Sequence, residues 1–212
     1  GLGDVYKRQG IAFQGVGSGT VVDYVQVHFN QDDGIEFFGG SVNASNLMVW
    51  GQGDDAIDID QGYSGTIDNV LVALTGASDH AFEIDGPEGS LMGSFSINNA
   101  TLIGATSNCE SLGTDGEMMD FRKGARGSLD SIFIKNFASG KDIELDAAVD
   151  ANNYTAGILN FSNIAIQQLE ECENESLELI FDDKSNTSTF SEDARGFAKI
   201  VTEKKYLSLI HI

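Results

Sequence analysis

An internal repeat constrains the fold of this chain more than any other feature of its sequence. The segment QDDGIEFFGG at 31–40 is followed by GQGDDAIDID at 51–60 and SDHAFEID at 78–85, with looser copies at 115–122 and 139–146. A repeat of this kind predicts a solenoid, because a single coil buries its apolar face only by stacking on its neighbours.

Each copy carries an acidic residue between two apolar ones, which is the alternation of a β-strand with one buried face. The superimposed residues are Glu36, Asp58, Glu83, Asp120 and Glu144, which follow one another after 22, 25, 37 and 24 residues. Near-constant steps with one insertion predict an all-β fold, a right-handed parallel β-helix that is a solenoid of about seven coils.

A second strand is expected in every coil. When these segments are aligned, Asn46, Asn69, Asn99 and Asn163 share one position. Asn tolerates the left-handed backbone of a sharp corner, and stacked amides can hydrogen-bond along a column. The residues expected to point inward are Val25, Val27, Ile35, Phe37, Leu47, Val49, Ile57, Ile59, Val70, Val72, Phe82 and Ile84.

The two ends of the chain carry a separate signature. The segments DVYKRQ and LSLIHI can be encoded by reverse-complementary strings that match a transposase adapter used for sequencing libraries. We therefore expect residues 1–9 and 207–212 to be adapter read-through, and exclude them from fold reasoning. The β-helix is expected over 10–183.

The segment 184–206 is expected to be a short helical or irregular C-terminal tail, or the start of a truncated region. A helix could run from Glu192 to Tyr206, with Ser191 as N-cap.

The charge, hydropathy and cysteine content of the chain limit the kinds of molecule that it can bind and the places where it can be located. The net charge of −21 argues against a nucleic-acid backbone as partner. No apolar run is long enough to span a membrane. Cys109 and Cys172 are expected in loops, where a disulfide and two free thiols both remain open. The sequence does not indicate an oligomeric state.

Stacking should place the polar residues of successive coils in columns with a spacing of about 4.8 Å. One column would hold Asp32, Asp54 and Asp79, the next Asp33, Asp55, His80, Glu117 and Lys141, and the last Asp60, Asp85, Arg122 and Asp146. The column that begins at Glu36 is expected to be a solvated acidic face. The corner aspartates could instead cap backbone N–H groups in Asx turns.

The predicted site is the corner where these columns begin, because crowded carboxylates need a bound cation or a shared proton. Calcium is the possible ion, since it accepts many oxygen ligands in loose geometry. Its candidate ligands are Asp32, Asp33, Asp54, Asp55 and Asp79. Without a metal, the neighbouring carboxylates should raise the pKa of His80.

The stretch GVGSGTVVDYVQVHFNQDDGIEFFGGSVNASNLMVWGQGDDAIDID resembles exported bacterial right-handed parallel β-helix proteins of the pectin-lyase-like superfamily. The phrases GSGT, DDGIEFFGG and GDD carry the likeness, which covers most of residues 10–146. The resemblance implies secretion or a location on the outer bacterial surface. It supplies no reaction, because a fold does not define a function.

The resemblance also suggests two enzymatic alternatives. In a polygalacturonase-like inverting hydrolase, the catalytic residues would be Asp32, Asp54, Asp55 and His80, and Arg122 and Lys123 would bind substrate. However, His80 lacks the family's flanking glycines, and the basic pair lacks its usual spacing. A calcium-dependent polysaccharide lyase would use Arg122 or Lys123 as base, although ion pairs of Arg122 with Glu117 and Asp120 are a simpler interpretation.

The favoured function is non-catalytic: a secreted or cell-surface protein that binds extracellular polysaccharide or another surface partner. Trp50 is the candidate for stacking on a sugar ring, and it aligns with His28 at the end of the preceding strand.

Overall fold

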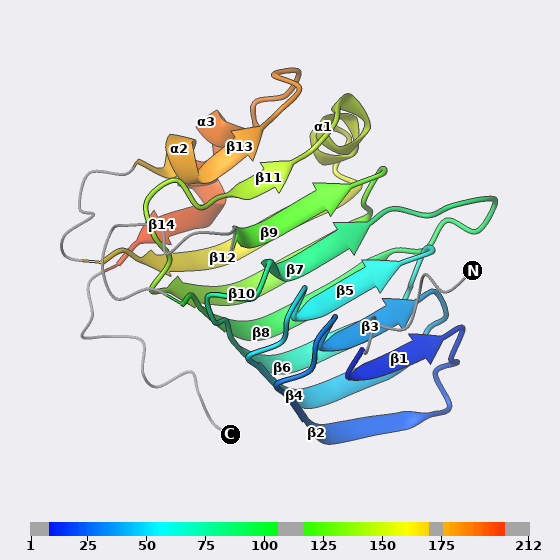
Figure 1. Cartoon of the computed structure of the whole chain (residues 1–212). Helices are drawn as coiled ribbons and strands as arrows, with labels where there is room; N and C mark the ends of the chain where they lie inside the picture. Colours follow the sequence, from blue (N-terminus) through cyan, green and yellow to red (C-terminus); the bar gives the residue numbers. More distant parts are fainter. Residues whose placement is uncertain (1–8, 106–116, 170–175, 202–212) are drawn as a thin grey trace, which may run out of the picture.

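The computed structural model describes residues 9–105, 117–169 and 176–201. Its strands form two parallel sheets of seven strands each, which face one another along the molecule (Figure 1). The chain alternates between the sheets, so that each coil contributes one strand to each. The predicted all-β, coiled architecture is therefore confirmed.

Sheet A contains the odd-numbered strands. They are β1 (Ile11–Gln14), β3 (Ile35–Phe38), β5 (Ile57–Asp60), β7 (His80–Asp85), β9 (Glu117–Arg122), β11 (Ile143–Leu145) and β13 (Phe181–Asp183). Sheet B contains β2 (Val21–His28), β4 (Asn43–Trp50), β6 (Thr66–Ala73), β8 (Phe95–Ile103), β10 (Gly127–Lys135), β12 (Leu159–Gln167) and β14 (Ala198–Ile200). The helices are α1 (Ala148–Thr155), α2 (Leu177–Ile180) and α3 (Phe190–Phe197).

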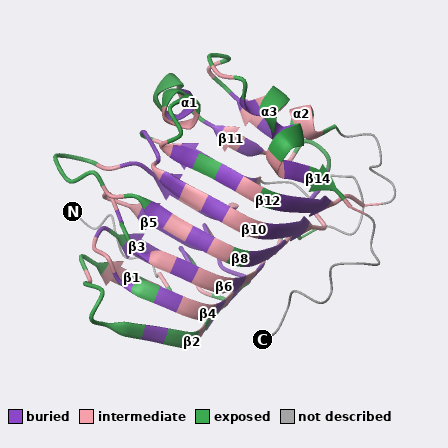
Figure 2. Ribbon diagram, turned by 180° about the vertical axis from the view of Figure 1, so that it is seen from behind, coloured by how far each residue is buried: buried purple, intermediate pink, exposed green. Residues whose placement is uncertain are grey.

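The core lies between the two sheets. The residues expected to point inward are buried, except that Val25 in the first coil is half-buried against the core. Figure 2 shows the reason, since β2 is the free edge of sheet B and no strand covers its outer side. Burial of each such side chain contributes about 1.5–3 kcal/mol to folding, and stacking supplies it.

A column of left-handed residues bends every strand of sheet B except the short β14. Asn46, Asn69, Asn99 and Asn163 have φ values of 56°, 57°, 55° and 53°, as the alignment predicts. The amide of Asn69 donates to Oδ1 of Asn46 in the coil before. The amide of Asn99 donates instead to the carboxylate of Asp68, at 2.8 Å. The column is therefore stabilised by amide and carboxylate acceptors together.

The last coil extends past residue 183, because β14 pairs in parallel with β12. Helix α3 begins at Phe190 with Thr189 as its N-cap, and ends at Phe197, so the helix is shorter than expected and starts earlier. Phe190 is fully buried and packs on Phe161 and Phe181. These rings anchor α3 over the end of the core.

Several expectations lie outside the described residues. They concern Cys109, Cys172, the adapter-like segments apart from Gln9, and the chain beyond Val201. Within the described part of the chain, no helix is long and apolar enough to cross a membrane.

Candidate functional site

The outer face of sheet A carries a continuous band of charged side chains, here called the acidic strip. Its central column is Glu36, Asp58, Glu83, Asp120, Glu144 and Asp182, which the strand register places side by side in successive coils. The flanking residues are Asp33, Asp55, His80, Glu117 and Lys141 before the strands, and Asp60, Asp85, Arg122, Asp146 and Lys184 at or after their ends. Parallel pairing thus gathers one or more carboxylates from every coil after the first.

The strip is not the solvated face that the sequence suggested. Glu36, Asp58 and Asp120 are only 7%, 8% and 5% exposed. Neighbouring carboxylates shield one another at this spacing, and burial makes their charges costly.

The predicted corner residues do converge. Asp32, Asp33 and Asp54 bring one carboxylate oxygen each to within 4.8 Å of one another, and so do Asp33, Glu36 and Asp58. Asp33 therefore belongs to two adjoining carboxylate clusters. The donor sets consist of oxygen alone, which suits calcium rather than zinc.

Asp55, Asp79 and His80 form a third cluster with a different character. Nδ1 of His80 lies 2.8 Å from Oδ1 of Asp55, 3.7 Å from Asp79 and 3.6 Å from Glu83. Burial opposes a charged imidazole, but the hydrogen bond and the charge of Asp55 outweigh it and raise the pKa of His80 to about 9. His80 is therefore a cation at neutral pH, which supplies positive charge to this cluster in place of a metal.

Burial raises the pKa of several carboxyl groups of the strip into or above the neutral range, and Asp58 and Asp33 are the two in its first half. Burial of Asp58, with the negative charge of Asp33 and then Asp60 nearby, raises its pKa to about 9. Burial of Asp33, followed by the charges of Asp55 and Asp32, raises its pKa to about 7. Oδ1 of Asp58 is buried and has no hydrogen-bond partner in the described chain. One carboxylate oxygen of Asp58 lies within 4.8 Å of oxygens of Asp33 and Glu36.

The basic pair expected to bind substrate is occupied by the protein's own carboxylates. Arg122 pairs with Glu83, with Asp85 at 2.8 Å and with Asp120 at 3.6 Å. Nζ of Lys123 lies 2.5 Å from the same Asp85. These contacts raise the pKa of both cations, even though burial opposes the charge on Arg122.

The partners of Arg122 differ from those expected on one point. Glu117 does not pair with Arg122 but accepts a 3.0 Å hydrogen bond from Lys141 in the next coil. Arg122 instead lies beside Asp85, its register partner, as the predicted column of Asp60, Asp85, Arg122 and Asp146 requires.

Lys184 is a strip residue that the sequence reading missed. Its Nζ lies 3.1 Å from Asp142, 2.7 Å from Glu144 and 3.0 Å from Asp182. The signal that could have found it is its position two residues after Asp182, since Arg122 follows Asp120 at the same interval.

Protein cations are distributed unevenly along the strip. Lys184, Arg122, Lys123, Lys141 and protonated His80 lie in the coils from β7 onward. By contrast, Asp33, Glu36, Asp58 and Asp60 around β3 and β5 form no ion pair with any described Lys, Arg or His. The carboxyl groups around β3 and β5 therefore lack the described protein cations that balance the second half of the strip.

An aromatic corner lies just before this half of the strip. Trp50, at the end of β4, is 40% exposed, and Phe29 is 62% exposed, with ring centroids 4.8 Å apart. A Cβ on Gly51 would lie 2.9 Å from Cε1 of Phe29, so only glycine leaves room for this ring. Trp50 and His28 are register partners, as the alignment predicts.

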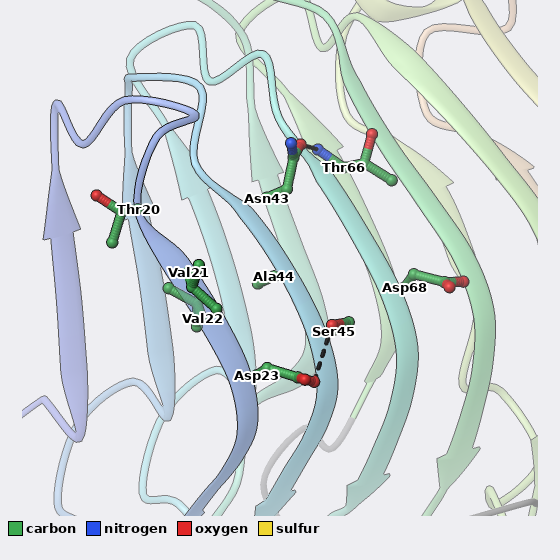
Figure 3. A pocket seen from close by; sticks show the side chains of 9 residues that line it. All are labelled: Thr20, Val21, Val22, Asp23, Asn43, Ala44, Ser45, Thr66 and Asp68. Atoms are coloured by element: carbon green, nitrogen blue, oxygen red, sulfur yellow. Dashed lines mark hydrogen bonds between the residues drawn. The ribbon is translucent and has the colours of Figure 1, made fainter.

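A surface hollow of about 400 Å³ lies at the free edge of sheet B (Figure 3). Its carboxylates have internal partners. Asp23 accepts hydrogen bonds from Ser45 at 2.9 Å and Asn46 at 2.7 Å, and Asp68 accepts one from Asn99. The hollow thus differs from the acidic strip, where buried oxygens lack partners.

Two parallel sheets wound through seven coils, with a polar strip on one outer face, define a parallel β-helix protein. The chain matches the family model described as pectate-lyase like beta helix domain over residues 4–204, and it belongs to that family. No curated protein and no solved structure matches the chain.

Proposed function

We propose that this protein is a non-catalytic binding module of an exported bacterial protein, which binds extracellular glycans on the outer face of sheet A. The observation that supports this proposal is the first half of the acidic strip. Asp33, Glu36 and Asp58 meet there without an ion pair to any Lys, Arg or His of residues 9–105, 117–169 and 176–201, and Oδ1 of Asp58 has no hydrogen-bond partner among the same residues. Such a cluster is costly unless its carboxyl groups are protonated or bind a cation.

Calcium fits the carboxylates beside this point. Asp32, Asp33 and Asp54 would hold it, with Asp58 and Glu36 adjoining. A calcium ion would neutralise the cluster and could bridge to hydroxyl or carboxylate groups of a glycan. Asp55 and Asp79 are less suited than expected as ligands, because the imidazolium of His80 already balances them.

Hydrolysis is the less favoured alternative. An inverting hydrolase keeps its two carboxyl groups about 6.5–9.5 Å apart, so that water fits between them. The nearest oxygens of Asp32 and Asp54 lie within 4.8 Å, and Asp55 is hydrogen-bonded to His80. This spacing favours a shared cation over an activated water.

Elimination requires a base near neutral pH. Arg122 and Lys123 are the candidates, and both are bound to Asp85 with their pKa raised. Neither is prepared to accept a proton from a sugar.

The test is incubation of the whole chain with a panel of neutral, acidic and amine-bearing polysaccharides, with and without calcium. We expect retention of a glycan in affinity electrophoresis, without new reducing ends or ultraviolet-absorbing unsaturated products. Reducing ends that disappear in Asp54→Asn would establish hydrolysis instead. Unsaturated products lost in Arg122→Gln would establish elimination. Absence of retention across the panel would contradict glycan binding.

A further inference from the structure

We propose that the first half of the acidic strip binds the primary ammonium groups of an amine-bearing glycan, a polymer of glucosamine units. This inference rests on the proposed glycan-binding function and names the chemical class of the glycan. It starts from the way in which the chain already seats ammonium groups on the same strip.

Lys184 is an ammonium group of the chain itself that is bound by carboxylates of the strip. Its ammonium lies within 3.1 Å of Asp142, Glu144 and Asp182, which come from two adjacent coils. The side chains of Asp142 and Glu144 are 14% and 19% exposed, so an ammonium reaches carboxylates that are largely buried.

The same column offers a similar pair of carboxylates without an ammonium, with Gly34 at the position of Asp142. Glu36 and Asp58 are register partners in β3 and β5, as Glu144 and Asp182 are in β11 and β13. Asp60 occupies the slot that Lys184 takes in the last coil, two residues after the central column. The last coil has the cation Lys184 at this position, whereas the coil of β5 has the carboxylate of Asp60.

The carboxylates around β3 and β5 favour a cationic glycan over an anionic one. A uronate chain would place its own carboxylates against Asp33, Glu36 and Asp58, and the net charge of −21 adds long-range repulsion. An ammonium group would be attracted to Glu36 and Asp58, whose Oδ1 has no hydrogen-bond partner in the described part of the chain, and could donate a charge-assisted hydrogen bond there. The surface is thus complementary to a cationic chain.

The aromatic corner provides a surface on which a sugar ring can stack, in addition to the carboxylates that attract the amines. Phe29 and Trp50 present exposed rings, and Phe29 is held in a left-handed backbone conformation with φ of 53° over Gly51. Asp33 is the fourth residue after Phe29, a path of at most about 14 Å when extended. A sugar oligomer can therefore stack a ring on the corner while its amines reach the strip.

The test is calorimetry with a fully deacetylated glucosamine hexamer and, as a matched probe, the N-acetylglucosamine hexamer. At about pH 5.5, where the weakly basic amines of the glucosamine oligomer are largely protonated, we expect the deacetylated hexamer to bind at least about tenfold more tightly. The Glu36→Gln/Asp58→Asn variant should lose about tenfold in affinity for the amine form only. Glu192→Gln, an exposed change on α3, should bind like the original chain.

Trp50→Ala should weaken both hexamers, whereas a short oligolysine should bind independently of Trp50 and more weakly than the glucosamine hexamer. Calcium should compete with the amine form, because both use Asp33 and Asp58. If the Glu36→Gln/Asp58→Asn variant does not fold, the salt dependence of the original chain replaces it, and binding that is insensitive to salt would overturn the inference.

Other outcomes separate this inference from the proposed function. Equal binding of both hexamers would overturn the ammonium site but leave glycan binding intact. Tighter binding of a uronate oligomer would likewise overturn the ammonium site and leave glycan binding intact. Oligolysine binding as tight as the glucosamine hexamer would show selection of ammonium without a sugar, and would overturn the glycan part.

Discussion

Nδ1 of His80 lies 2.8 Å from Oδ1 of Asp55, the residue that occupies the same column in the preceding coil. The backbone N–H of His80 donates to the same oxygen at 2.9 Å. A carboxylate that receives both bonds orients the imidazole and keeps it protonated. This pair gives the strip an internal cation at β7, immediately after the coils that have none.

The first prediction concerns the ionisation of His80. Its pKa should lie near 9, and should return to about 6.5 in the Asp55→Asn variant or in the unfolded chain. Because folding raises this pKa, its stabilisation is complete below about pH 6.5 and is lost as pH rises through 9. An NMR titration of the imidazole measures it, and a midpoint near 6.5 in the folded protein would contradict the assignment.

The second prediction concerns Asp58. Its raised pKa means that the folded state favours the protonated carboxyl, so cation-free protein should lose stability as pH rises from about 4 towards 9. Asp58→Asn does not titrate. Near pH 8 it should be more stable than the original chain by about 2 kcal/mol, or roughly 4–8 °C in melting temperature.

Thermal melts across this pH range, with chelator present, provide the measurement. The pH-dependent part of the difference between the two proteins should vanish below about pH 3, where Asp58 is protonated in the folded and unfolded states alike. Glu192→Gln serves as control for a lost surface charge, and should follow the original chain at every pH. A constant difference at all pH values would show that packing, and not ionisation, distinguishes Asp58→Asn.

The third prediction uses Lys184. Lys184→Ala leaves Asp142, Glu144 and Asp182 without their ammonium, and should destabilise the protein by about 1–2 kcal/mol, because the lysine side chain is 41% exposed. Millimolar butylammonium should restore part of this loss. Equal concentrations of tetramethylammonium, which has no N–H donor, should restore less. Indifference to both would contradict the view that the strip binds ammonium groups.

The fourth prediction concerns the corner of sheet B. Asn69 has φ of 57°, and a β-branched residue there is strained. Asn69→Val should cost about 1–3 kcal/mol in the free energy of unfolding. Asn69→Gly also loses the bond to Asn46, yet accepts the conformation, so it should cost less. Denaturant unfolding measures both variants, and a lower free energy of unfolding for Asn69→Gly than for Asn69→Val would count against this explanation of the Asn column.

The register of the strip could be predicted from the sequence because it depends on the period of two and on like residues recurring at a coil-length interval. Glu36 and Asp58 align by that rule alone, and the structure pairs them. Their burial could not be predicted, since it depends on side chains of three coils shielding one another. The expected solvated face was wrong for this reason.

The cations of the strip were predicted only in part. The contact of Arg122 with Asp85 follows from the predicted column, but its contact with Glu83 in the central column was not predicted. Lys184 follows the region where the repeat becomes weak, so its column was not recognised. The clustering of Asp32, Asp33 and Asp54 needed only adjacent coils, and it was predicted.

The central claim is that the first half of the acidic strip binds a cation, and a melting experiment tests it most directly. At about pH 8, calcium at a hundred times its dissociation constant should stabilise the original chain by about 2.7 kcal/mol, or roughly 5–11 °C. Asp33→Asn/Asp58→Asn should melt higher than the original chain in chelator and should gain nothing from calcium. An equal calcium-dependent rise in both proteins, or none in the original chain, would contradict the claim.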